Sequence, residues 1–91
     1  MMTQFEQRVL ALIDEMVEHG TDDELFAGGY LRGHLTLAVA DAEADGVSSL
    51  SELAQRVNAS LDAAIAKGEL SPPDQVLVRN LWQQLYQQAA V

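Results

Sequence analysis

Four stretches of the chain place apolar residues three and four positions apart, which is the period of an amphipathic helix. The first stretch runs from Thr3 to His19, and mainly acidic or amide side chains occupy its opposite side. Its apolar positions are Phe5, Val9, Leu12, Ile13, Met16 and Val17. Gly20 follows directly and suits the left-handed conformation that ends many helices. This pattern predicts a helix over residues 3–19.

The second stretch begins with a hydroxyl, two acids and a glutamate, Thr21-Asp22-Asp23-Glu24. This order is typical of a capping box, in which the first and last side chains bond to each other's backbone N–H groups. Acids in a first turn also interact favourably with the helix dipole. We therefore favour a structural explanation of the acidic cluster over an acidic binding site.

The adjacent glycines Gly28 and Gly29 leave two interpretations of the helix that follows. Either one helix runs from Asp22 to about Ala44, or it breaks at the glycines, which together cost about 2 kcal/mol relative to alanine inside a helix. We favour the break: a helical turn over 22–27, a kink, and a helix over 29–44. The predicted apolar stripe of that helix is Leu31, Leu35, Ala38, Val39 and Ala42.

The third helix is predicted between two turn signals. Asp45-Gly46 ends the second helix, and Ser49 with Glu52 forms a second capping-box pattern. Apolar residues then recur at helical spacing from Leu50 to about Lys67. Gly68 follows and suits the end of this helix.

The fourth helix is predicted to begin after Ser71, which suits the N-cap, with Pro72 in the first helical position. A wide apolar face continues to about Ala89. Because the connections are short, neighbouring helices should be antiparallel. The sequence therefore predicts a single all-α domain over residues 1–91: a four-helix, mostly antiparallel up-down bundle or a close variant.

The charge of the chain narrows the choice of partners. Fourteen acids and five bases give a net charge of −9. Nucleic acids and anionic membranes attract clustered lysine and arginine, whereas the bases here are scattered singly at Arg8, Arg32, Arg56, Lys67 and Arg79. We expect neither nucleic-acid nor membrane binding. The start of the chain lacks the basic and apolar regions of a signal peptide, so a cytoplasmic location is expected.

The chain offers few groups for catalysis or metal binding. It has no cysteine and no serine nucleophile motif. A protonated His19 suits the end of the first helix, and His34 neighbours an apolar stripe, so both imidazoles have structural explanations. A weak metal site near Glu15 and His19 is one alternative, although the Glu-x-x-His pairs of di-metal bundles are absent. We expect a non-enzymatic protein with no metal and no cofactor.

A carrier protein of the acyl-carrier type is a second alternative. Such small, acidic, helical carriers attach phosphopantetheine to a serine that opens a helix, and Ser49 opens one here. These carriers have Asp-Ser-Leu at that point, whereas this chain has Ser48-Ser49-Leu50. An N-cap role explains Ser49 fully, so we favour the structural explanation.

The segment around Tyr30 is the best candidate for a surface that contacts an unidentified protein partner or a second copy of the chain. Tyr30 and His34 are four positions apart and share a helical face, with Gly33 beside them. Arg32 points elsewhere, and we expect it to pair with an acid of the preceding cluster. The candidate surface consists of Asp22, Asp23, Glu24, Tyr30, Arg32, Gly33 and His34.

Gly33 lies four positions after Gly29, so the two glycines share a face. Missing side chains at this spacing allow a neighbouring helix to approach closely or leave a groove for a ligand. We favour close packing on Gly33, which predicts that Gly33→Ala destabilises the fold.

Three strings of residues run through these elements: Arg8 to Asp14, Thr21 to Ala38, and Gly68 to Pro72. The longest contains the specific string Gly29-Tyr30-Leu31-Arg32-Gly33-His34-Leu35. On these strings the chain resembles the YfcL-like family of small uncharacterised bacterial proteins along essentially its whole length. The resemblance implies an all-helical fold, and it carries over no activity, substrate or catalytic residue.

Overall fold

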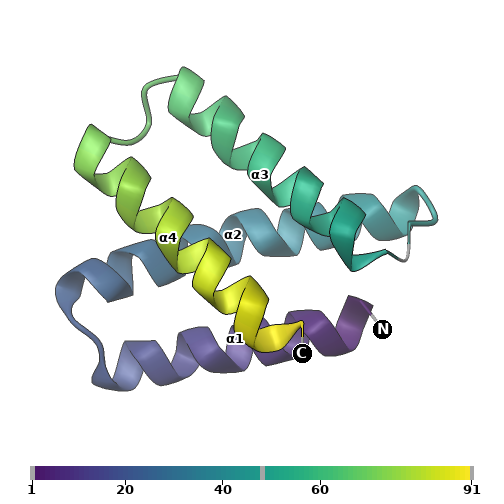
Figure 1. The fold of residues 1–91 in the computed structure, drawn as a ribbon, viewed down its shortest axis with the longest axis horizontal. Helices are drawn as coiled ribbons and strands as arrows, with labels where there is room; N and C mark the ends of the chain where they lie inside the picture. The colour runs from purple at the N-terminus through teal and green to yellow at the C-terminus, as the bar shows by residue number, and fades with distance from the viewer. Residues whose placement is uncertain (1, 48, 91) are drawn as a thin grey trace.

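The computed structural model describes residues 2–47 and 49–90, without the side chains of residues 2, 3 and 17. It contains four helices, α1 (Met2–His19), α2 (Asp22–Ala44), α3 (Leu50–Ala66) and α4 (Pro72–Ala89), and no strand within these residues (Figure 1). The predicted all-α fold and its four helices are therefore confirmed. The expected apolar role of the Val17 side chain lies outside the described residues.

The four helices are arranged around α2, which packs against α1, α3 and α4. Consecutive helices run in opposite directions, so the chain forms two antiparallel hairpins, α1–α2 and α3–α4 (Figure 1). The second hairpin lies across the first, and α4 crosses α1 and α2 obliquely (Figure 1). The result is a flat molecule with extents of 35 × 30 × 17 Å, a variant of the up-down bundle with crossed hairpins.

The expected break of the second helix at Gly28-Gly29 is wrong, because α2 is one helix of 23 residues. Gly28 is buried, and a Cβ added to it would lie 3.3 Å from Cγ2 of Ile13 on α1. The glycine thus allows α1 and α2 to pack closely. Tertiary contacts along the whole of α2 outweigh the local cost of two glycines, about 2 kcal/mol.

The helix ends follow the predicted caps with two differences. The capping box of α2 is complete, with the Glu24 N–H 3.2 Å from Thr21 Oγ1 and the Thr21 N–H 3.0 Å from Glu24 Oε1. At α3, the Ser49 hydroxyl accepts from the Glu52 N–H at 3.4 Å, but the reciprocal bond of the predicted box is not found among the described residues. Ser71 caps α4 as expected, accepting from the Asp74 N–H.

The second difference is at Gly20, which was expected in the left-handed conformation. Among the described residues only Gly46 and Gly68, with φ of 74° and 79°, have a positive φ, and they end α2 and α3. Gly20 has a different reason to be glycine, because a Cβ there would collide with the carbonyl oxygen of Met16. The Gly20 N–H donates to that same oxygen.

The core lies between the two hairpins. At one end, the Phe5 ring on α1 packs edge-on against Trp82 and Tyr86 on α4, with ring centroids 6.4 and 5.7 Å apart. Aliphatic side chains fill the rest of the core, as the low aromatic content requires. Its largest fully buried members are Phe5, Val9, Ile13, Leu31, Leu35, Leu53, Val57, Leu61 and Val78.

Candidate functional site

The side of α2 that faces away from the core is apolar, although it is in contact with solvent. Its positions alternate steps of four and three along the helix, which places them in one line. We call this surface the outer face of α2 and define it as Phe26, Tyr30, Gly33, Leu37, Ala40 and Ala44. Five of the six are exposed, including Phe26 at 44% and Leu37 at 60%, and Tyr30 is half-buried.

The outer face exists because α2 is apolar on both sides. Its buried stripe, which includes Leu31 and Leu35 at 1% exposure each, packs against the other three helices. At 100° per residue, the outer positions lie on the opposite side of the helix from this stripe. Tyr30 also packs against the core, but the five exposed members of the line do not belong to it. Exposed apolar surfaces of this kind often mark interaction sites.

Three aromatic rings form a continuous stack at the N-terminal half of this surface. The Phe26 and Tyr30 ring centroids are 6.0 Å apart, and those of Tyr30 and His34 are 4.7 Å apart. Each spacing is one helical turn. The structure thus brings Tyr30 and His34 together with Phe26, a residue that the sequence reasoning did not select.

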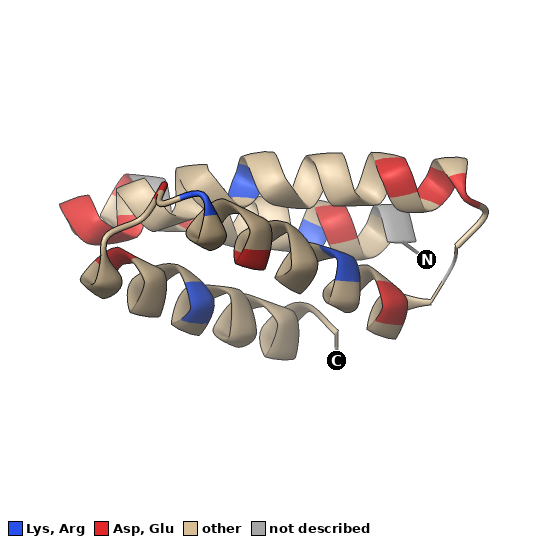
Figure 2. Ribbon diagram, turned by 90° about the horizontal axis from the view of Figure 1, so that it is seen from above, with Lys and Arg blue, Asp and Glu red and all other residues tan. Residues whose placement is uncertain are grey.

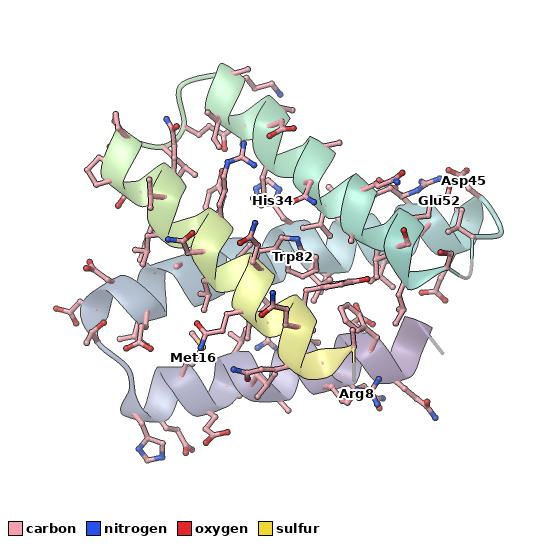
Figure 3. All side chains as sticks on the ribbon, in the orientation of Figure 1. Arg8, Met16, His34, Asp45, Glu52 and Trp82 are labelled. Atoms are coloured by element: carbon pink, nitrogen blue, oxygen red, sulfur yellow. The ribbon has the colours of Figure 1, made fainter. Side chains whose placement is uncertain are left out.

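Hydrogen bonds to other elements fix two of these rings. The Tyr30 hydroxyl donates to Glu69 Oε1 at 3.0 Å, and His34 Nδ1 lies 2.5 Å from Ser60 Oγ on α3. Figure 3 shows His34 between α2 and α3. Burial raises the pKa of Tyr30 above its ordinary value of 10.0, and the hydrogen bond and negative charge of Glu69 add to this effect. The stack is therefore held in place before any partner binds.

The remaining predicted site residues lie elsewhere. Arg32 points away from the outer face, and its Nη1 atom is 2.7 Å from Asp14 Oδ1 on α1. The expected pairing of Arg32 with the cluster Asp22–Glu24 is therefore wrong, because Asp14 on the neighbouring helix is within reach. Asp22 and Asp23 are exposed in the first turn of α2, and Glu24 completes its capping box.

The expected close packing on Gly33 is also wrong. A Cβ added to Gly33 would have no atom within 4 Å beyond its own helix and chain neighbours, and the same holds for Gly29. Both glycines are exposed, and Gly33 lies in a shallow hollow with Tyr30, His34 and Leu37. Gly28, on the buried side, is the glycine that contacts another helix.

Sequence reasoning missed Phe26, Leu37, Ala40 and Ala44. Their signal was present, because positions 26, 30, 33, 37, 40 and 44 form a second line of helical spacing beside the core stripe. The break predicted at Gly28-Gly29 separates Phe26 from the other five positions, so the sequence pattern alone does not join them into one line. A helix with two apolar lines must contact something on both sides or expose one of them.

A second hollow lies between α1 and α4 and has a volume of about 280 Å³. Leu12, Met16, Leu81 and Leu85 supply apolar walls, and Figure 3 shows Met16 between these two helices. Polar residues at its edge include His19, whose side chain is exposed. The His19 Nε2 atom lies 3.7 Å from Glu18 Oε2. No group of three or more acidic, histidine or cysteine residues in the described part of the chain could hold a metal ion.

The charges leave the middle of the outer face neutral. The acids of α2 are Asp22, Asp23 and Glu24 in its first turn and Asp41 and Glu43 toward its other end. Figure 2 shows red acidic positions near the ends of the helices. Arg32, Arg56 and Arg79 each pair with an aspartate on another helix or at a helix end, so these bases do not form a basic patch. None of the helices in the described residues is both long enough and apolar enough to cross a membrane.

Comparison with known proteins places the chain in a family. The YfcL protein family matches residues 3–87. The chain is 56% identical over 90 residues to the uncharacterized protein YfcL of Escherichia coli strain K12, covering 99% of this chain and 98% of that protein. No solved structure matches the chain. With this match over nearly its full length, the chain belongs to the YfcL family.

Proposed function

We propose that the chain is a non-enzymatic protein–protein interaction module and that the outer face of α2 is its contact surface. The observation that carries this proposal is the exposure of Phe26 and Leu37, at 44% and 60%, in one apolar line on the central helix. When a partner buries exposed aromatic and aliphatic side chains, their removal from water favours binding.

The fixed geometry of the stack supports the same proposal. Ordering mobile side chains costs conformational entropy on binding, and a surface that is already ordered avoids part of this cost. Glu69 and Ser60 hold Tyr30 and His34 in their observed positions. A partner would therefore meet a rigid aromatic surface with polar groups at one edge, a combination common at interfaces.

The pair of His34 and Ser60 resembles the base and nucleophile of a hydrolase, but its surroundings favour a structural role. Both residues lie within helices, where backbone N–H groups are used in helical hydrogen bonds and are not available to stabilise an oxyanion. No carboxylate is found hydrogen-bonded to His34 among the described residues, whereas Ser-His-Asp triads use such a group to orient the imidazole. These features support a non-enzymatic function.

The proposal is tested by comparing two substitutions that change charge equally at equally exposed positions. Leu37 on the outer face and Val76 on α4 are both 60% exposed. Tagged wild-type protein, Leu37→Glu and Val76→Glu are used to capture proteins from cells, and the captured chains are quantified by mass spectrometry. We expect Leu37→Glu to lose specific partners that Val76→Glu retains. Equal capture by all three proteins would contradict the proposed surface.

A further inference from the structure

Resting on the proposed function, we infer that the outer face of α2 binds a second copy of this chain, with the two α2 helices antiparallel. The inference comes from the order of large and small residues on the outer face. Phe26, Tyr30 and Leu37 are large, whereas Gly33, Ala40 and Ala44 are small.

These six positions form three pairs that are symmetric about residue 35. Phe26 lies as far before residue 35 as Ala44 lies after it. Tyr30 and Ala40 form the second such pair, and Gly33 and Leu37 form the third. Every pair joins one large residue with one small residue.

A two-fold axis that passes through the outer face at the level of residue 35 would place the members of each pair opposite each other across an antiparallel contact. Each large side chain would then meet a glycine or alanine of the other copy, which is how closely packed helices interdigitate. A parallel contact in register would set Leu37 against Leu37 and Gly33 against Gly33. Large side chains would then collide at some positions along the contact, and small residues would leave gaps at others. The residue order therefore favours the antiparallel pair.

Charge also permits two copies to meet on the outer face of α2. Each copy carries a net charge of −9, so copies repel one another in general. The outer face itself contains no ionisable carboxylate or base, and Arg32 is directed to Asp14 on another side of α2. An antiparallel contact would bring Asp22 and Asp23 of each copy near Asp45 at the end of α2 in the other, so some repulsion persists at the ends.

The length of the outer face of α2 sets the expected affinity of the dimer. The step from residue 26 to residue 44 spans about 27 Å of helix at 1.5 Å per residue. One helix pair of this length is at or below the roughly 1,000 Å² of total buried area that a stable interface needs. The dimer should therefore be weak, and it should become tighter when added salt screens the acidic ends.

The first test is sedimentation equilibrium of the purified chain over a wide concentration range, at low and at high salt. We expect a monomer–dimer equilibrium whose dissociation constant falls as salt is added. Leu37→Glu should raise that constant by roughly a hundredfold, because two leucines leave the contact and two like charges enter it. Val76→Glu, with the same charge change, should alter it by less than about threefold. Circular dichroism of each variant checks that its helices are retained.

The second test reads the orientation of the two copies. The natural chain has no cysteine, so single cysteines can be introduced without competition. Gly33→Cys and Leu37→Cys chains of different tag length are mixed and oxidised. The antiparallel contact predicts mainly mixed disulfides between the two variants. Disulfides mainly between identical variants would overturn the antiparallel arrangement.

A chain that stays monomeric at all concentrations and salt levels would overturn self-association, as would a dimer that both glutamate variants weaken equally. These failures are separate from failure of the proposed function. If the chain is monomeric but Leu37→Glu still loses captured partners that Val76→Glu keeps, the surface binds another protein. If neither experiment distinguishes the two variants, both proposals are wrong.

Discussion

The Tyr30 hydroxyl on α2 donates a hydrogen bond of 3.0 Å to Oε1 of Glu69, which lies in the connection between α3 and α4. This bond joins the aromatic stack to an element 39 positions later in the chain. It also gives the stack a property that can be measured, because the pKa of Tyr30 is raised by burial and by Glu69.

We predict that Glu69→Gln lowers the pKa of Tyr30, because the substitution removes the negative charge that opposes tyrosinate formation. The measurement is an ultraviolet absorbance titration in a Tyr86→Phe background, in which Tyr30 is the only remaining tyrosine. An unchanged titration curve would show that Glu69 does not act on Tyr30 in solution.

The same raised pKa predicts how stability depends on pH. Above the unfolded pKa, near 10, the folded state holds the phenolic proton that the unfolded state has lost. The contribution of Tyr30 to stability is therefore fully present below pH 10 and is lost as the pH rises through the folded pKa. Tyr30→Phe should remove this part of the pH dependence, as seen in urea melts at alkaline pH.

Three glycines of α2 are predicted to respond differently to alanine. At concentrations where the chain is monomeric, Gly29→Ala and Gly33→Ala should each stabilise the fold by up to about 1 kcal/mol, because the added methyl groups meet open space and alanine favours the helix. Gly28→Ala should destabilise it, because the methyl group would lie 3.3 Å from Ile13 Cγ2 and overpacking costs about 1–3 kcal/mol.

Urea melts followed by the fluorescence of Trp82, which is only 3% exposed, would measure these three variants. Circular dichroism provides a second signal that does not depend on the tryptophan. A lower urea midpoint for Gly33→Ala, or a higher one for Gly28→Ala, would contradict the packing described for α2.

The sequence predicted most of the helix boundaries because capping and termination depend on nearby residues. Thr21, Ser49 and Ser71 bond to backbone groups three residues away, so their roles can be inferred from local order. The same holds for Gly46 and Gly68, whose positive φ values end their helices.

The role of each glycine in α2 could not be predicted in this way. Gly28 and Gly33 have the same intrinsic propensity, and they differ only in whether Ile13 of another helix lies over them. The partner of Arg32 depends likewise on the position of Asp14 after α1 and α2 have packed. Such contacts follow from the arrangement of the helices and not from local sequence.

Arg32 is predicted to have a minor and purely structural role. Its side chain is 47% exposed and that of Asp14 is 65% exposed, so water screens the ion pair. Arg32→Ala should cost less than about 1 kcal/mol in the free energy of unfolding. A double-mutant cycle with Asp14→Ala measures the pair directly. Partner capture that falls with Arg32→Ala as strongly as with Leu37→Glu would show instead that Arg32 belongs to the contact surface.

The central claim, that the outer face of α2 is a contact surface, is tested most directly by photo-crosslinking inside cells. A benzophenone amino acid replaces Leu37 in one variant and Val76 in another, two apolar positions that are both 60% exposed. We predict discrete crosslinked species from position 37 and none of comparable yield from position 76, with the chain itself as the crosslinked partner. Equal yields at the two positions, or no crosslink at position 37, would contradict the claim.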